Sequence, residues 1–479
     1  MRELFPSLAA ARRGLWRGVR CFGRGLRKFG RAMIYVLSVL VLIHLVAVVV
    51  TGRQLQGDVE RLTKAGIIVP SKDLIPTVPP GAQNAADVYQ KAWDALRLSN
   101  EDESALFDPW VKHDAPWFAL ARRVVAANPE YYRLVDRAAS MSTCVFPVNW
   151  KAGFAATFPH FSQMRRAARL LALRPYVYTA EGRADDALAS IETLFRAAQQ
   201  TQTDPVLIAD LVSYGIQGIG VRALSDILPT GAPTPAACRS LYDQLGEIDN
   251  VRSSARTMRG EMALWGTIVW EWLRSGRMSV SDLTSTDGGQ FDVGRPPRLI
   301  GRLRAWAWRP LLNMDERVYL SYMDREIRAF DLPWPRSRDT IDALQKELDT
   351  KTPFYAVVTR VVMPVFGRAV WSRDRATASD RTAQVALALK AYRYDHAVYP
   401  ASLAELEAAG WKLPLDPFGS KPLHYRRQGA GFAVWSLGPD MDNDDAARDF
   451  ESYNEKVKGI GPRSERPPED YDIVFRCAR

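Results

Sequence analysis

Residues 32–50 read AMIYVLSVLVLIHLVAVVV, a run of nineteen residues that contains no formal charge. At about 1.5 Å of rise per residue, a helix over this run is roughly 28 Å long, which matches the hydrocarbon core of a bilayer. A signal peptide has a shorter apolar run of about 7 to 15 residues followed by a small-residue cleavage site, and this sequence has neither feature. We therefore expect residues 32–51 to form an uncleaved signal-anchor, a transmembrane helix that contacts membrane lipid.

The charges beside this run predict its orientation. Residues 1–31 contain nine Arg or Lys and one Glu, a net charge of +8, while the whole chain of 479 residues carries +10. The other 448 residues therefore carry only +2, so the basic character belongs to a short tail and does not indicate nucleic-acid binding. Because basic flanks stay inside, we expect 1–31 to be a cytoplasmic tail and the chain beyond it to be extracytoplasmic.

The remaining sequence predicts a helical body. Residues 52–84 are expected to form a Pro-rich linker, and roughly 66–84 should be extended, since this part contains Pro70, Pro76, Pro79, Pro80 and Gly81. Asn84 is a good helix N-cap, and apolar residues then repeat at helical spacing. Residues 85–372 thus form a predicted extracytoplasmic helical domain, with helices at about 115–126, 129–140, 162–181, 184–200, 205–227, 234–248 and 250–274. Short connections favour an antiparallel helical array.

One part of this domain is rich in arginine and tryptophan. Residues 278–310 begin with a polar loop and then contain Arg295, Arg298, Arg302, Arg304, Arg309, Trp306 and Trp308. Guanidinium groups bind phosphate and tryptophan favours membrane interfaces, so this zone suits a lipid headgroup surface or another anionic partner. The alternative is that the tryptophans are core residues and the arginines form a solvated face.

Catalytic patterns are not evident in the sequence. The five histidines lack zinc-ligand spacing, and the chain has no phosphate-binding loop, nucleophile elbow or Rossmann glycine pattern. We expect a non-catalytic binding or scaffold role toward a protein or glycan partner. The alternatives are an extracytoplasmic hydrolase with a dispersed active site and an accessory subunit of a membrane complex. Cys144, Cys238 and Cys477 would lie outside the cytoplasm, where one disulfide or separate buried thiols are both compatible with the sequence.

The last hundred residues predict a small α+β module. A helix from about 374 to 395 is followed by two alternating segments, 423–426 and 432–437, separated by a glycine-containing turn. This pattern indicates a β-hairpin. The predicted fold class is therefore mainly α, with one N-terminal transmembrane helix, a helical array and a C-terminal α+β module at 373–450. Residues 451–479 are expected to form a C-terminal tail.

The module resembles the C-terminal part of the type II secretion major pseudopilin. The resemblance rests on the ordered motifs Tyr399-Pro400, Leu415-Asp416-Pro417, Gly431-Phe432 and Ser436-Leu437-Gly438. It implies a helix packed on a small sheet, a secretion-related role and a calcium-binding loop. The whole chain, whose body opens with Asn84-Ala85-Ala86, resembles uncharacterised membrane-anchored envelope proteins of planctomycete-like bacteria. This second resemblance implies no known activity. From the anchor and its orientation we expect a location in the bacterial inner membrane, with the bulk of the chain periplasmic or extracytoplasmic.

The loop that corresponds to the pseudopilin calcium loop reads GPDMDNDDAARD. Carboxylate oxygens are the hard ligands that calcium prefers. The sequence therefore offers Asp440, Asp442, Asp444 and Asp445 as candidate calcium ligands. The run is not an EF-hand, because it lacks Gly at its sixth position and Glu at its twelfth. A solvated acidic loop is the alternative.

Overall fold

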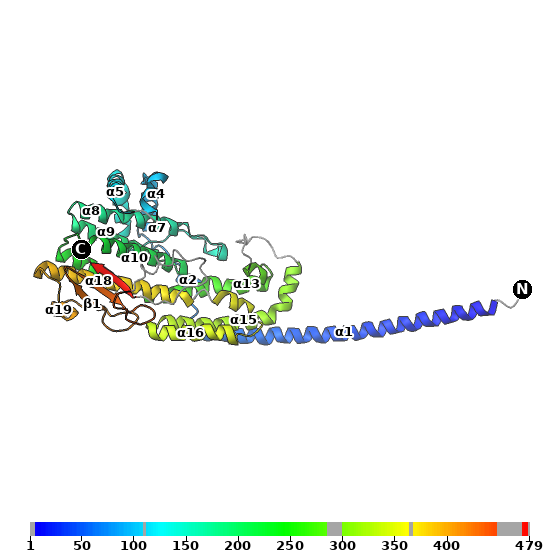
Figure 1. The fold of residues 1–479 in the computed structure, drawn as a ribbon. Helices are drawn as coiled ribbons and strands as arrows, with labels where there is room; N and C mark the ends of the chain where they lie inside the picture. The colour runs from blue at the N-terminus through cyan, green and yellow to red at the C-terminus, as the bar shows by residue number, and fades with distance from the viewer. Residues whose placement is uncertain (1–4, 109–111, 285–298, 364–366, 448–471, 478–479) are drawn as a thin grey trace.

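The computed structural model describes residues 5–108, 112–284, 299–363, 367–447 and 472–477. Over these residues the chain is mainly helical with one three-stranded antiparallel sheet, so the mainly-α prediction is confirmed. A body of packed helices holds the sheet on one side, and a single long helix projects from the opposite end (Figure 1).

The projecting helix is α1, Phe5–Lys64, which at 60 residues is about 90 Å long. Side chains of residues 31–43 are exposed, and contact with the body begins at His44. By length and composition the stretch Arg31–Lys64 could cross a membrane. A second helix, α10 (Leu207–Ile227), passes the same test, but 61% of its apolar window is buried inside the body, as expected of a core helix.

The beginning of the Pro-rich linker, before the part expected to be extended, is helical. Residues 52–64 continue α1 without a break, and they pack against α15, Leu299–Phe330. The Asn313 amide donates to the Thr51 hydroxyl at 3.2 Å, and the Arg317 guanidinium donates to Asp58 at 2.7 Å. Leu62 is fully buried in this contact region. The two helices run parallel, so the membrane-type helix is also a structural part of the body.

The segment after α1 contains one short helix, α2 (Ser71–Leu74), before the helical body starts at α3. The helices of the body are α3 Ala85–Ala95, α4 Asn100–Phe107, α5 Ala115–Ala127, α6 Pro129–Ala139, α7 Pro159–Leu171, α8 Leu173–Ala180, α9 Ala184–Thr201, α10, α11 Pro235–Gly246, α12 Asn250–Glu261, α13 Thr267–Ser275, α14 Val280–Thr284, α15, α16 Trp334–Lys351 and α17 Val357–Val362. The Asn84 side chain caps α3 by accepting from the Ala86 backbone N–H, as expected.

Two predicted helices are interrupted. The helix expected at 162–181 breaks at Ala172, three residues before Pro175, whose ring nitrogen cannot donate to the preceding turn. The helix expected at 250–274 contains a π turn at Met262–Gly266. A Cβ atom on Gly266 would lie 2.2 Å from the Tyr319 hydroxyl, so only glycine allows the close approach of α15 here.

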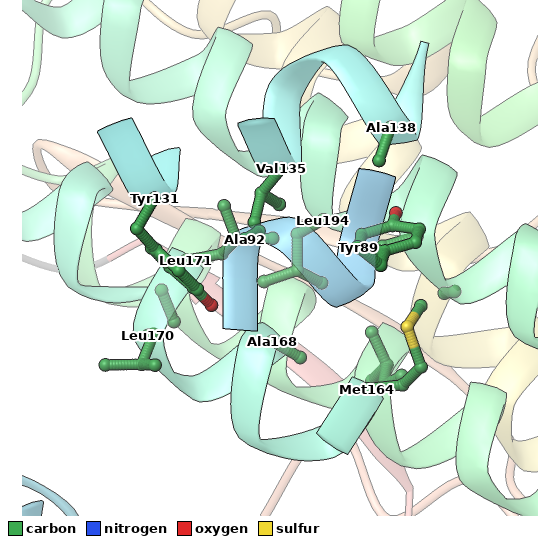
Figure 2. Close-up of a cluster of buried hydrophobic side chains, with 14 of the residues drawn as sticks. Tyr89, Ala92, Tyr131, Val135, Ala138, Met164, Ala168, Leu170, Leu171 and Leu194 are labelled. Carbon is green, nitrogen blue, oxygen red and sulfur yellow. The ribbon is translucent and has the colours of Figure 1, made fainter. Parts of the chain in front are cut away.

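The first core lies between α3, α6, α7 and α9. Tyr89, Val135, Met164 and Leu194 are almost fully buried there, and small residues such as Ala168 let the helices approach closely (Figure 2). The Tyr89 hydroxyl donates to the Gln200 side chain at 2.7 Å, so its buried polar end is satisfied.

The C-terminal module belongs to the same body. Helix α18, Gly367–His396, crosses the expected boundary at 372/373, and its buried side chains from Ala383 to Ala391 pack between α10, α11 and the sheet. Strands β1 (His424–Gln428) and β2 (Gly431–Ser436) form the expected hairpin, with Gly429 at a positive φ of 56° in the turn. The short helix α19, Leu403–Ala408, precedes them.

The third strand comes from the segment expected to be a tail. Strand β3, Ile473–Cys477, pairs antiparallel with β2, with Val434 opposite Phe475. Its inward-facing residues Ile473, Phe475 and Cys477 are buried. The rest of the expected tail lies mostly outside the described residues.

Candidate functional site

The aspartates predicted to bind calcium lie in the loop that follows β2. Asp442 and Asp445 are exposed, whereas Asp440 and Asp444 are partly buried. The Asp442 carboxylate accepts from the Asn443 backbone N–H at 2.8 Å, and Asp440 accepts from the Asp442 backbone N–H at 3.2 Å. These bonds hold the loop in its turns. The carboxylates of the two exposed residues, Asp442 and Asp445, are accessible to solvent.

A further carboxylate, Asp472, joins this loop from the chain just before β3. Asp472 has no exposed surface, and one of its oxygens accepts from the Ala446 backbone N–H at 2.8 Å. Its other oxygen, Oδ1, is buried and accepts no hydrogen bond. Burial, together with the nearby charges of Asp444 and Asp440, raises the pKa of Asp472 to about 7.

The arrangement fits calcium only in part. The orphaned Asp472 oxygen beside two other carboxylates is the kind of group that a cation would satisfy. Within the described residues, however, no three acidic, His or Cys side chains converge closely enough to hold a metal ion. The ligand set of Asp440, Asp442, Asp444 and Asp445 stays a prediction.

Asp416, from the Leu415-Asp416-Pro417 motif, has a structural position. Its side chain is buried and accepts from the Phe418 backbone N–H, the Ser436 hydroxyl and the Leu437 backbone N–H at 2.7 to 2.9 Å. Three bonds to one carboxylate tie the turn after α19 to the end of β2.

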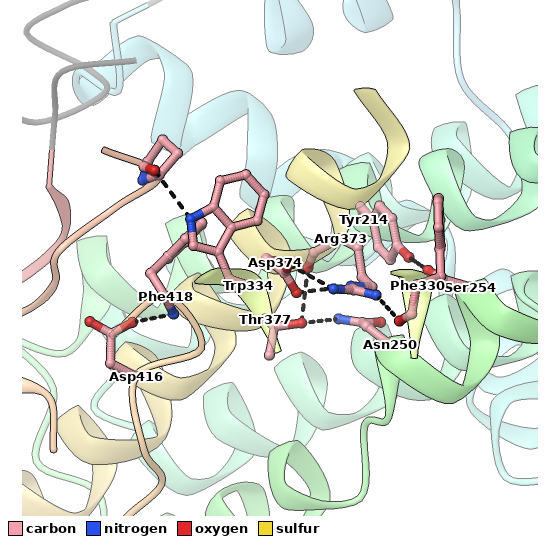
Figure 3. A network of polar contacts seen from close by, with 11 residues as sticks. Tyr214, Asn250, Ser254, Phe330, Trp334, Arg373, Asp374, Thr377, Asp416 and Phe418 are labelled. Carbon is pink, nitrogen blue, oxygen red and sulfur yellow. Dashed lines mark hydrogen bonds and ion pairs between the residues drawn. The ribbon is translucent and has the colours of Figure 1, made fainter. Parts of the chain in front are cut away.

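Buried polar groups form a network in the centre of the body (Figure 3). The Arg373 guanidinium donates to both oxygens of Asp374, at 2.8 and 2.7 Å, and to the carbonyl of Phe330. Asn250 donates to the Thr377 hydroxyl at 3.4 Å. The network joins α12, α15 and α18, and its charged members are sealed from solvent.

The structure also pairs a histidine with an acid. His160 on α7 lies 2.9 Å from Asp204, and its ring stacks on Phe146 at a centroid distance of 4.4 Å. Both side chains are about 95% buried or more. The two residues are 44 positions apart, so no local sequence pattern could pair them. Burial and the charge of Asp204 raise the pKa of the adjacent Cys144 thiol to about 12, unlike that of an activated nucleophile.

The arginine- and tryptophan-rich zone divides into two parts. The tryptophans that flank the zone in the sequence, Trp270, Trp272 and Trp334, are core residues. Trp306 and Trp308 are exposed on the first turns of α15, together with Leu299, Ile300 and Leu303. This part of α15 lies at the end of the body from which α1 projects (Figure 1). Arg295 and Arg298 lie outside the described residues.

A polar groove of about 420 Å³ runs between α1, α15 and α16. Three ion pairs line it: Arg317 with Asp58 at 2.7 Å, Arg61 with Asp58 at 3.5 Å, and Arg325 with Glu347 at 2.9 Å. The lining also includes Tyr322, Tyr355 and Lys351. Such a mixture of charged and aromatic groups suits a polar partner.

Comparison of the chain with protein-family models, with curated proteins and with solved structures gives no match. The resemblances to the pseudopilin and to planctomycete-like envelope proteins therefore stay predictions.

Proposed function

We propose that this chain is a single-pass protein of the bacterial inner membrane, anchored by residues 32–51, with a cytoplasmic N-terminus and an extracytoplasmic body. The observation that carries the proposal is the apolar part of α1, none of which the body buries. Leaving such a run in water is unfavourable by about 25 cal/mol per Å² of apolar surface, and a bilayer removes that cost. The net charge of +8 before the run favours the proposed orientation.

The body in this proposal has a non-catalytic binding or scaffold role. The acid and base side chains that could serve chemistry, such as His160 with Asp204 and Arg373 with Asp374, are enclosed in the packing and hold helices together. The groove beside α1 supports binding of a polar partner, a protein segment or a glycan.

Calcium binding at the Asp-rich loop is part of the same proposal. Calcium would draw Asp440 and Asp444 toward Asp472 and satisfy its orphaned oxygen. Calcium at millimolar levels is expected to raise the Tm of the full chain, and Asp472→Asn should abolish the rise. Asp395→Asn, at an exposed aspartate of α18 outside the loop, is the control that removes the same charge. A Tm that calcium leaves unchanged would exclude the site.

The topology is tested with reporters fused after Arg479 in a bacterial host. Alkaline phosphatase should be active and green fluorescent protein dark if the body is extracytoplasmic. A matched variant, Leu40→Arg with Ile43→Arg, changes two exposed side chains of α1 and should release the protein from membranes, because each arginine opposes insertion by about 2.5 to 3.5 kcal/mol. Fluorescent membranes without phosphatase activity would contradict the proposal.

The binding role is tested by co-purification from solubilised membranes followed by mass spectrometry. Lys351→Glu reverses a charge in the groove, while Lys346→Glu makes the same change on an exposed part of α16 outside it. A partner of the groove should be lost with the first variant and retained with the second. Equal recovery with both variants would place the partner elsewhere.

A further inference from the structure

A basic pocket lies where the end of α13 meets the start of α15. It has a volume of about 360 Å³ and is lined by Arg274, Ser275, Arg277, Arg302, Trp306 and Arg309. Four guanidinium groups thus converge on one hollow from two segments of the chain. We call these six residues the basic pocket.

Two glycines bring the segments together. Gly276 ends α13 with a positive φ of 75°, which L side chains rarely adopt. A Cβ atom on Gly276 would lie 2.6 Å from the carbonyl carbon of Gly301, and one on Gly301 would lie 2.9 Å from the carbonyl oxygen of Gly276. The backbones therefore touch at this point, and Arg274, Arg277 and Arg302, which lie close to these glycines in the sequence, line a common space.

The charge of the basic pocket is only partly balanced. Arg274 donates to Glu316, which lies buried behind the pocket. Arg277, Arg302 and Arg309 make no ion pair within the described part of the chain, and the lining contains no acid. Like charges held in one hollow repel each other, and an anion with several oxygens relieves that repulsion. Guanidinium groups match the oxygens of a phosphate with paired hydrogen bonds.

The position of the basic pocket favours one source of phosphate. Its Trp306 ring contacts the His44 ring at a centroid distance of 4.1 Å, and His44 lies six residues, or about 9 Å, before the end of the apolar run at Val50. The contact therefore lies beside the outer third of the apolar run, which leads to the membrane interface where tryptophan is enriched. The neighbouring side chains Leu299, Ile300 and Leu303 are exposed and apolar, as expected of groups that enter the same layer.

The geometry of α15 agrees with this position. Pro310 stands inside the helix, and the turns before it bend away from the direction of α1 (Figure 1). The start of α15, which supplies Arg302, Trp306 and Arg309 to the basic pocket, therefore lies at the end of the body that faces the proposed bilayer. We propose that the basic pocket binds the phosphate of an anionic phospholipid headgroup in the outer leaflet of the membrane that α1 spans. The inference rests on the proposed membrane anchoring and names the ligand of that interface.

The test uses native mass spectrometry of the full chain in a neutral detergent, titrated with dioleoyl-phosphatidylglycerol or dioleoyl-phosphatidylcholine. Arg277→Gln with Arg302→Gln removes two pocket charges. Arg304→Gln with Arg336→Gln removes two exposed charges outside the pocket, so the total charge of the two double variants is equal. Circular dichroism melting of both variants checks that they fold.

We expect the pocket variant to bind phosphatidylglycerol at least about tenfold more weakly than the wild type, since each charge-assisted bond contributes about a factor of ten. The control variant should change by less than about twofold, and phosphatidylcholine retention should be the same for all three proteins. Equal loss in both double variants would overturn the proposal. Displacement of the lipid by inorganic phosphate at the same concentration would assign the site to soluble phosphate and also overturn it.

This experiment does not depend on which side of the membrane the body occupies, because the protein is in detergent. A reversed reporter topology with intact lipid binding would therefore refute the proposed orientation and the assignment to the outer leaflet, but not the lipid site. Normal topology with no preference for phosphatidylglycerol would refute the pocket assignment alone.

Discussion

Replacement of Arg373 by Met is expected to destabilise the body strongly. Arg373 has no exposed surface, and its guanidinium is bonded to both Asp374 oxygens and to the Phe330 carbonyl. Methionine keeps most of the volume but leaves a carboxylate and a carbonyl buried without this partner. Breaking a buried ion pair on one side costs about 3 to 5 kcal/mol of unfolding free energy.

The cost should depend on pH. Burial raises the pKa of Asp374 and Arg373 opposes that rise, so the pKa climbs further when Arg373 is absent. In the variant the folded state then holds a proton that the unfolded state releases above about pH 4. The stability lost through Asp374 is therefore smallest near pH 4 and grows as the pH rises through the raised pKa.

The measurement is urea denaturation of the full chain in mild detergent, followed by tryptophan fluorescence at pH 5 and pH 8. Arg373→Met with Asp374→Leu removes both charges and should cost less than the sum of the single changes, with a coupling of about 2 kcal/mol or more. Arg336→Met, at an exposed arginine of α16, is the control and should change stability by less than about 0.5 kcal/mol. A cost below about 1 kcal/mol at pH 8, or the same cost at both pH values, would refute this reasoning.

Three further predictions concern buried groups and the helix contact. Glu326 is buried with an unbonded Oε2, and burial raises its pKa to about 8, so its favourable contribution is complete below about pH 4.5 and is lost as the pH rises to 8. The unfolding free energy of Glu326→Gln relative to the wild type, measured by urea denaturation, should therefore rise by about 2 kcal/mol or more from pH 5 to pH 8.5. The same relative stability at both pH values would contradict the assignment. Gly301→Val should lower the unfolding free energy by about 1 to 3 kcal/mol, because the added Cβ meets the Gly276 carbonyl. Ala307→Val, on the exposed side of α15, should cost far less. Equal Tm values for the two variants would argue against the contact. The three described cysteines are separate buried thiols, and burial raises the pKa of Cys144 and Cys238 to about 12. A reductant should therefore leave the Tm unchanged, and iodoacetamide should label these thiols only after unfolding. A lower Tm in the presence of reductant would indicate a disulfide.

Local patterns in the sequence were sufficient for much of the fold. Apolar spacing and caps predicted most body helices to within a few residues, because each pattern lies inside the segment that folds. The β1–β2 hairpin was predictable for the same reason. The helical stretch 52–64 could also have been found, since Leu55, Val59 and Leu62 repeat at helical spacing before the prolines begin.

Features that join distant segments were not predictable from local patterns. Strand β3 is short and pairs with a strand some forty residues earlier, and its burial comes from that partner. Asp472 joins the acidic loop through the same pairing, so it was missed as a member of the site. Helix α15 was overlooked because arginines and Pro310 obscure its apolar spacing, and the basic pocket needs the contact of two glycines 25 residues apart.

The continuity of α1 has a mechanical consequence in the proposed topology. The same continuous helix spans the membrane and then packs along α15 from His44 to Leu62, so no flexible linker separates the bilayer from the folded body. A helix adjusts to a thinner or thicker membrane by tilting. A change in the tilt of α1 would therefore rotate the whole body relative to the membrane. The local membrane thickness would then set the orientation of the body's binding surfaces.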